Sequence, residues 1–199
     1  MFNKSKNDNM TYGIVGLGRF GMALAIDLAE SGSEIIALDS NEEKVQAIRE
    51  YTENAFIVKN LEKKTLIETG IQNCDVAIVC IGEHMDTSIL TTLNLVSMGV
   101  PKVISKAMSS EHGVILKKLG AEIVFPEKDM AVRLASRLET ERMLDFVQLS
   151  EKINVSKMNV PDKMIDKSVE EVNLRKHFGL NIIAIENNEN VNDVISPKY

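Results

Sequence analysis

Three glycines with a fixed spacing are the residues of this sequence whose chemistry is most readily inferred. Gly16, Gly18 and Gly21 have the spacing Gly-x-Gly-x-x-Gly, after an apolar run and before a segment of helical periodicity. Such a turn brings backbone N–H groups and the positive end of a helix dipole close to a phosphate. Asp39 closes the next apolar run, where an acid can accept hydrogen bonds from ribose hydroxyls. The pattern predicts a nucleotide site. The alternatives are a fold of this kind that binds no ligand and, for Asp39, an acid that only begins a helix.

Arg19 lies inside the glycine turn, where the backbone has no need of a charged side chain. Its guanidinium has five N–H donors and can contact phosphate oxygens in the same subunit or in a neighbouring one. The alternative is a surface arginine in water. Ser40 and Asn41 follow Asp39, so no arginine stands where it would neutralise a ribose 2′-phosphate, and NADP is disfavoured.

Residues for catalysis are sparse. The three histidines, His84, His112 and His177, have no plausible partner beside them in sequence, and His112 is expected to face solvent from a helix. The sequence has no zinc-type Cys/His spacing, no nucleophile elbow and no P-loop lysine. Ligand-gated regulation is therefore favoured over catalysis, and we expect no enzyme. The alternatives are a small NAD(H)-dependent oxidoreductase and an NAD(H)-responsive redox sensor.

Composition excludes several other classes. The net charge of -6 argues against nucleic acid as a partner, because binding phosphate backbones needs clustered Lys and Arg. No apolar run approaches the ~18 residues of a membrane span, and the first nine residues lack a signal-peptide core. Cys74 and Cys80, both in or beside an apolar run, are expected to be buried thiols in a reducing compartment. These features predict a cytoplasmic protein without direct membrane insertion.

The elements that position the glycine turn alternate along the chain. Strand-like runs lie at 14–16, 34–39, 56–58, 76–81, 103–106 and 123–125, and helical segments at 20–30, 42–52, 62–68, 87–98 and 110–119. This alternation predicts an α/β fold, a Rossmann-like doubly wound parallel sheet.

Three regions are expected. Residues 1–9 form a flexible tail, residues 10–144 a nucleotide-binding domain that ends in a long crossover helix at 129–144, and residues 145–199 a small α+β lobe. In the lobe the pattern predicts strands at 146–149 and 153–155, a helix at 169–177 and a hairpin over 181–195. Small residues of the crossover helix, Ala131 and Ala135, suit packing either on another subunit or on the domain's own sheet.

The sequence also resembles a known family. Its motifs are Gly-Leu-Gly-Arg-Phe-Gly at 16–21, Ala-Leu-Asp at 37–39 and Pro-Glu-Lys-Asp-Met at 126–130. They resemble the RCK (KTN) family, most closely the cytosolic gating subunits of bacterial Ktr potassium uptake systems, over residues 10–197. The resemblance implies homodimers that assemble into an octameric ring beneath a membrane potassium-translocating subunit. It also implies that ATP and ADP compete for the glycine turn.

The same resemblance implies roles for particular residues. Arg19 contacts terminal phosphates, Asp39 the ribose and Lys106 a phosphate, while Glu127 lies near a Mg or Ca ion at a dimer interface. After the third strand, Val58-Lys59-Asn60-Leu61 stands in place of the family's Gly-Asp-Ala-Thr, a segment that touches adenine, and the acid of that segment is missing. The full expected nucleotide site is Gly16, Leu17, Gly18, Arg19, Phe20, Gly21, Asp39, Ser40, Lys59, Asn60, Leu61, Ile81, Gly82, Glu83 and Lys106.

The C-terminal lobe resembles the family's TrkA-C lobe, which implies that two lobes bind cyclic di-AMP between them. Arg175 would pair with a phosphate, and apolar residues would flank the bases. The alternative is that the apolar positions are simply lobe core. The matching residues are Val169, Leu174, Arg175, Asn181, Ile182 and Pro197. The sequence ends at Tyr199, where family lobes usually continue, so the lobe is expected to be either naturally short or truncated.

Overall fold

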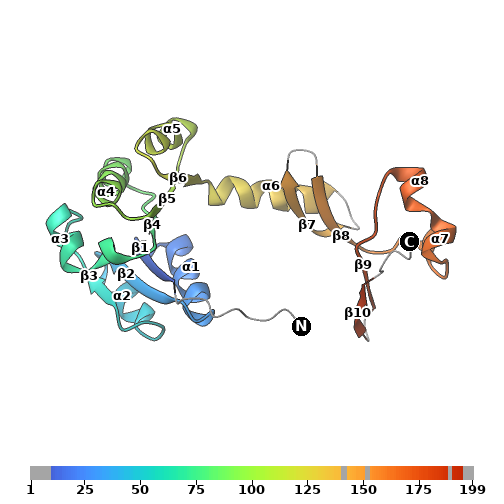
Figure 1. Ribbon diagram of the computed structural model, residues 1–199, viewed down its shortest axis with the longest axis horizontal. Helices are drawn as coiled ribbons and strands as arrows, with labels where there is room; N and C mark the ends of the chain where they lie inside the picture. The colour runs from blue at the N-terminus through green and yellow to red at the C-terminus, as the bar shows by residue number, and fades with distance from the viewer. Residues whose placement is uncertain (1–9, 140–142, 151–152, 188–189, 195–199) are drawn as a thin grey trace. The chain divides into compact units, whose positions relative to one another are not determined.

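The computed structural model describes residues 10–139, 143–150, 153–187 and 190–194 (Figure 1). The chain divides into two compact units, Met1–Met130 and Ala131–Tyr199, called here the first and the second unit. Within the described ranges, no helix combines the length and the apolar composition needed to cross a membrane.

The first unit is built on a six-stranded parallel sheet of order β3-β2-β1-β4-β5-β6. Its strands are β1 (Thr11–Val15), β2 (Glu34–Asp39), β3 (Ala55–Ile57), β4 (Val76–Val79), β5 (Lys102–Lys106) and β6 (Glu122–Val124). The order reverses between β1 and β4, because the chain winds first to one side of β1 and then to the other. This is the doubly wound sheet that the sequence predicts.

Helices cover both faces of this sheet. They are α1 (Arg19–Glu30), α2 (Glu42–Ile48), α3 (Lys63–Glu68), α4 (Met85–Ser97) and α5 (Ser110–Lys118), with a short 3-10 helix η1 (Ile71–Asn73). Buried residues of α1 and α2 pack with Ile14 and Ile78 on one face, whereas Leu66 of α3 and Leu95 of α4 pack with Val79 on the other. The strands are nearly continuous apolar runs because both faces are buried. The predicted burial of Cys74 and Cys80 is confirmed.

The helix expected at 129–144 lies earlier in the chain, since α6 spans Pro126–Glu139. Proline suits the first position of a helix, because its missing N–H would be unpaired there in any case. Met143, expected to lie on this helix, instead begins a strand of the second unit.

The second unit consists of small local elements. Strands β7 (Met143–Ser150) and β8 (Ile153–Met158) form an antiparallel pair, as do β9 (Ala184–Asn187) and β10 (Asn190–Val194). Between the pairs lie a 3-10 helix, η2 (Asp162–Met164), and helices α7 (Val169–Val172) and α8 (Leu174–Phe178). The helix expected at 169–177 is thus broken. Asn173 adopts a left-handed conformation with φ 44°, which ends one helix and begins the next.

Several polar side chains of α4, β5 and α5 are buried. Thr92 and Ser105 share a hydrogen bond of 2.8 Å between their hydroxyl oxygens. His112 was expected to face solvent, but its side chain is fully buried on α5. Its Nδ1 accepts a hydrogen bond of 3.3 Å from the Met108 N–H, while Nε2 has no partner among the described residues. The helical pattern identified the element correctly but not the side that this histidine faces.

Acid should destabilise the first unit through His112. Burial lowers the pKa of His112 below its ordinary value of 6.5, because the imidazolium would lose its hydration. The unfolded chain therefore binds a proton more readily, so stability is full above pH 6.5 and falls as pH drops towards the folded pKa. For one proton, the free energy of unfolding changes by at most about 1.4 kcal/mol per pH unit. Urea unfolding at several pH values measures it.

Two variants assign that loss to one histidine. His112→Gln should lose the acid-dependent part of the unfolding free energy. His84→Asn, at the exposed start of α4, should keep it. An equal pH slope in wild type and His112→Gln would contradict the assignment.

Candidate functional site

The carboxyl ends of the six strands meet at one edge of the sheet, and the residues expected at the site follow those ends. Ligands of open parallel sheets bind at this edge, in the crevice where the strand order reverses. Here that crevice lies between β1 and β4. The residues at this edge are Gly16–Gly21 after β1, Asp39 at the end of β2, Lys59–Leu61 after β3, Ile81–Glu83 after β4, Lys106 at the end of β5 and Glu127 after β6.

The glycine turn has the geometry of a phosphate cradle. Gly16 has φ 97°, a conformation that L side chains rarely adopt, and its N–H donates to the Leu38 carbonyl at 2.8 Å. A Cβ on Gly21 would lie 2.0 Å from the Gly16 carbonyl oxygen, so α1 can pack against the turn only with glycine there. Gly18 caps α1 without a side-chain hydrogen bond, and the first turn of α1 contains no acid. The amino end of α1 therefore offers its N–H groups and its positive dipole end to an anion.

Asp39 ties this turn to the neighbouring strand. Its side chain is 9% exposed, and its Oδ2 accepts a hydrogen bond of 2.6 Å from the Leu17 N–H. Its Oδ1 accepts from the Asn41 N–H at 2.8 Å, and the Lys44 ammonium lies 3.9 Å from Oδ2. Sequence reasoning gave Asp39 a role in ribose binding but missed this contact. A carboxylate oxygen has two lone pairs, so Asp39 can hold the turn and still accept from a ribose hydroxyl.

Lys106 and Glu127 lie on the β4 side of the crevice, whereas Arg19 begins α1 beside the glycine turn. The Lys106 ammonium, at the end of β5, makes an ion pair with Glu127 Oε1 at 2.5 Å, and Glu127 lies 21 positions later in the sequence, on the first turn of α6.

 Lys106 is 8% exposed, whereas the Glu127 side chain is 62% exposed. The hydrogen bond from Lys106 lowers the pKa of the Glu127 carboxyl, and the charge of Arg19 adds to this effect. The charges of Arg19 and Lys106 thus act on the same carboxylate. The two cations and the Glu127 carboxylate together retain a net positive charge.

The loop after β4 leaves room beside Lys106. A Cβ on Gly82 would lie 3.2 Å from the Met108 sulfur and 3.6 Å from the Lys106 ammonium nitrogen. Ile81 and Gly82 are half-buried, and Glu83 is exposed. The absence of a side chain at Gly82 therefore keeps the approach to Lys106 open on this side.

The segment after β3 lies beside Asp39, because the Val58 N–H donates to the Asp39 backbone carbonyl at 2.9 Å. Lys59 and Asn60 are exposed, and Leu61 is half-buried. The Asn60 side-chain oxygen accepts hydrogen bonds from the Glu62 N–H and the Thr65 hydroxyl. That oxygen therefore helps to begin α3, a role that the sequence analysis did not foresee.

The other expected residues are distributed as follows. Phe20 is half-buried against the core, and Ser40 is exposed. In the second unit, Val169, Arg175 and Asn181 are exposed, while Leu174 and Ile182 are half-buried. Pro197 lies outside the described residues. Among the described residues, no group of three or more His, Cys, Asp or Glu side chains could hold a metal ion.

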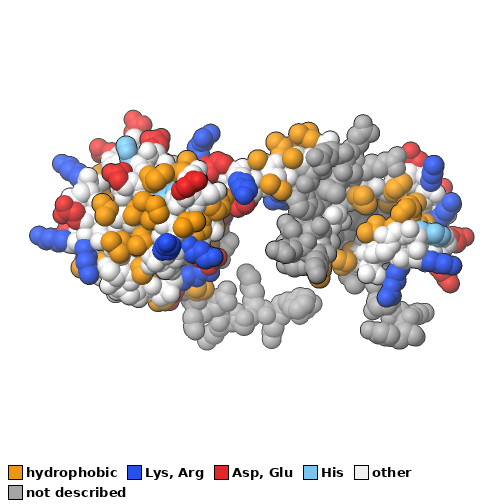
Figure 2. All heavy atoms as spheres, turned by 90° about the horizontal axis from the view of Figure 1, so that it is seen from above, with side chains coloured by type: hydrophobic (Ala, Val, Ile, Leu, Met, Phe, Trp, Pro, Cys, Tyr) orange, Lys and Arg blue, Asp and Glu red, His pale blue; other side chains and the backbone are white. Residues whose placement is uncertain are grey.

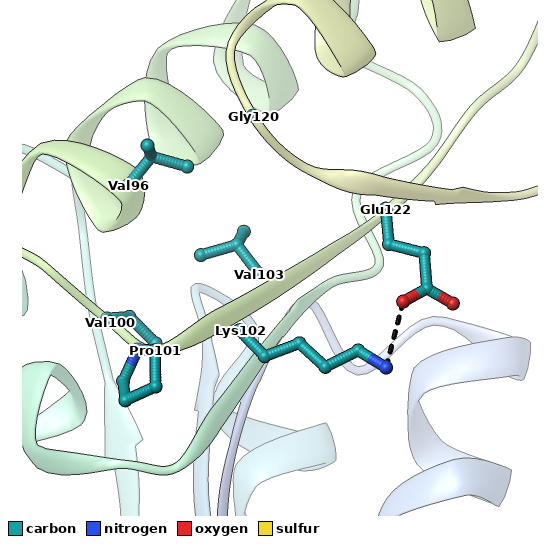
Figure 3. A pocket seen from close by; sticks show the side chains of 7 residues that line it. All are labelled: Val96, Val100, Pro101, Lys102, Val103, Gly120 and Glu122. Carbon is teal, nitrogen blue, oxygen red and sulfur yellow. Dashed lines mark ion pairs between the residues drawn. The ribbon is translucent and has the colours of Figure 1, made fainter.

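A pocket lies at the opposite edge of the sheet (Figure 3). It is lined by Val96, Val100, Pro101, Lys102, Val103, Gly120 and Glu122. Lys102 and Glu122 pair at 2.8 Å, and both side chains are more than half exposed. Because Lys102 begins β5 and Glu122 begins β6, the pocket is at the amino ends of these strands, away from the glycine turn. Its lining consists largely of valines and an ion pair whose charges cancel, so the pocket contributes no residue to the nucleotide site.

Known proteins are similar to this chain in sequence and in fold. The family model for the TrkA-N domain matches residues 12–127. The Ktr system potassium uptake protein A of Bacillus subtilis (strain 168) is 36% identical over 184 residues, which cover 92% of this chain and 83% of that protein.

Two solved structures are similar in fold. A structure of GsuK bound to ADP has a TM-score of 0.53 and 24% identity, covering 67% of this chain and 35% of that one. The GsuK channel bound to NAD has a TM-score of 0.56 and 23% identity, covering 91% of this chain and 32% of that one. Because the family model matches more than half of the sequence, the chain belongs to the TrkA-N (RCK) family, among relatives that include a Ktr potassium uptake protein.

Proposed function

We propose that this chain is a non-catalytic regulatory subunit that binds ATP or ADP in the glycine turn and gates a membrane potassium-translocating subunit. The observation that carries the proposal is the placement of two cations at the edge where the turn opens, Arg19 at the start of α1 and Lys106 at the end of β5. Two cations beside a phosphate cradle suit a ligand with several phosphate charges. The protein would act in the cytoplasm, at the inner face of the membrane, through its partner.

The nucleotide would lie across the crevice between β1 and β4. Its phosphates would contact the amino end of α1, with Arg19 and Lys106 on the terminal phosphates. Asp39 would accept from the ribose, and Lys59–Leu61 would lie towards the adenine. Glu127 would supply one oxygen to a Mg or Ca ion, whose other ligands would come from phosphate oxygens, water or a second copy of the chain.

Exposed apolar side chains support assembly into homodimers and an octameric ring. Hydrophobic side chains gather on the face of the first unit that carries α4 and α5 (Figure 2). Leu90 and Leu93 of α4 and Val114 and Ile115 of α5 are 42–58% exposed. Patches of this kind on a soluble domain mark interaction sites, and a ring of identical chains would cover them.

The second unit would bind cyclic di-AMP between two copies. Arg175 would contact a phosphate, with Val169, Leu174 and Ile182 beside the bases and Asn181 nearby. Three of these residues lie on or beside the two short helices α7 and α8, where Arg175 is exposed and able to meet an anion.

NAD(H) remains the second candidate ligand, with a redox sensor or a small oxidoreductase as the corresponding function. It is favoured by Asp39, which suits the ribose of either nucleotide, and by the similarity in fold to the NAD-bound GsuK channel. Arg19 and Lys106 favour ATP and ADP, because the two phosphates of NAD are both internal and carry less charge.

Potassium flux tests the proposal. Vesicles containing the potassium-translocating subunit of a Ktr system should show flux that depends on this chain and differs between ATP and ADP. The control is the same vesicles without the chain. Equal flux with ATP, ADP and no nucleotide would contradict the regulatory role.

A further inference from the structure

We propose that Glu127 occupies the place of a nucleotide phosphate at Lys106 in the ligand-free chain. Nucleotide binding would then exchange one anionic partner of Lys106 for another and release Glu127. This inference rests on the proposed nucleotide site and adds to it an internal competitor.

The burial of Lys106 requires a partner at all times. Its side chain is 10% exposed, and a buried ammonium without an anionic partner is strongly unfavourable. Glu127 provides that partner in the ligand-free structure. A phosphate oxygen can replace it, because both groups accept charge-assisted hydrogen bonds. Lys106 is therefore expected to pass from Glu127 to a phosphate oxygen while keeping an anionic partner throughout.

Glu127 is the member of the pair that can leave at low cost. Its side chain is 62% exposed, so the freed carboxylate regains water. It also stays on the first turn of α6, where a negative charge is favourable. Lys106, by contrast, is held at the end of β5 within the sheet.

The pair also opposes an incoming phosphate directly. Glu127 neutralises Lys106 and is itself close enough to Arg19 for that charge to lower its pKa. A carboxylate there both occupies a donor and repels a polyphosphate. Removing its charge should therefore tighten binding when no divalent cation is present.

The released carboxylate belongs to the first unit, on the helix whose sequence continues into the second unit. Helix α6 spans Pro126–Glu139, and the units divide after Met130. Phosphate binding at Lys106 would thus leave the Glu127 carboxylate as an unpaired negative charge on the first turn of α6.

Calorimetric titration of the full chain with ATP in EDTA tests the exchange. Glu127→Gln should bind ATP about 2- to 5-fold tighter than wild type, as expected for removing a partly exposed competing ion pair. Asp129→Asn, which removes an acid from the same exposed helical turn, should bind as wild type does. Glu127→Asp keeps the charge on a shorter side chain and should lie between wild type and Glu127→Gln.

The outcomes separate the two proposals. Unchanged or weaker ATP binding by Glu127→Gln, with wild type binding normally, would overturn the exchange alone. Failure of wild type to bind any nucleotide would overturn the proposed function and the exchange with it. Should Glu127→Gln not fold, Glu127→Asp decides: tighter ATP binding than in wild type supports the exchange, and unchanged or weaker binding overturns it.

Discussion

Replacing Gly21 by alanine should destabilise the first unit and abolish nucleotide binding. The added Cβ would lie 2.0 Å from the Gly16 carbonyl oxygen and 3.0 Å from the Cys80 Cβ. The first contact is with backbone in the glycine turn, so relief requires α1 to move away from the sheet. Overpacking of this kind costs about 1–3 kcal/mol or more. Thermal unfolding and calorimetric titration with ATP measure the two effects.

Gly18→Ala is the matched control. No heavy atom lies within 4 Å of a Cβ built at Gly18, and its φ of -68° suits any residue. The variant should therefore keep wild-type thermal stability, although a methyl group at this position can hinder a phosphate. Equal loss of stability in Gly18→Ala and Gly21→Ala would contradict the account of the turn.

Arg19→Ala should weaken ATP binding by about 10- to 100-fold and ADP binding by less. A hydrogen bond to a charged group contributes about 1.5–3 kcal/mol, and about 1.4 kcal/mol corresponds to a tenfold change in affinity. Arg19 is exposed at the start of α1, and alanine is a good helix former, so folding should not suffer. Calorimetric titration with both nucleotides measures the change.

Lys117→Ala controls for the loss of a positive charge. Lys117 is exposed near the carboxyl end of α5, away from the strand ends that form the site. Its replacement should leave both affinities unchanged. A comparable loss in this variant would mean that Arg19 acts only through the net charge of the chain.

The sequence was sufficient to predict the sheet and the glycine turn. Apolar runs of strand length separated by amphipathic segments specify parallel strands with helices on both faces, and few other arrangements bury those runs. Gly16 and Gly21 were informative because their roles are local, one in the conformation of a turn and the other in the close approach of a helix.

Features that depend on the final packing were not predicted. Two interactions of the site join elements that are distant in sequence. Asp39 accepts a hydrogen bond from the Leu17 N–H, and Lys106 pairs with Glu127. The burial of His112 depends on which side of α5 meets α4 and the sheet, and a weakly amphipathic segment does not specify this. The break at Asn173 reflects a single residue in a left-handed conformation, which helical periodicity does not detect.

The most direct test of the central claim is the ratio of ATP to ADP affinity in wild type and in Arg19→Ala, with NADH titrated alongside. The account predicts that wild type binds ATP and ADP more tightly than NADH, and that Arg19→Ala lowers the affinity for ATP more than that for ADP. Equal losses for ATP and ADP, or tightest binding by NADH, would contradict a site that distinguishes nucleotides by their terminal phosphate.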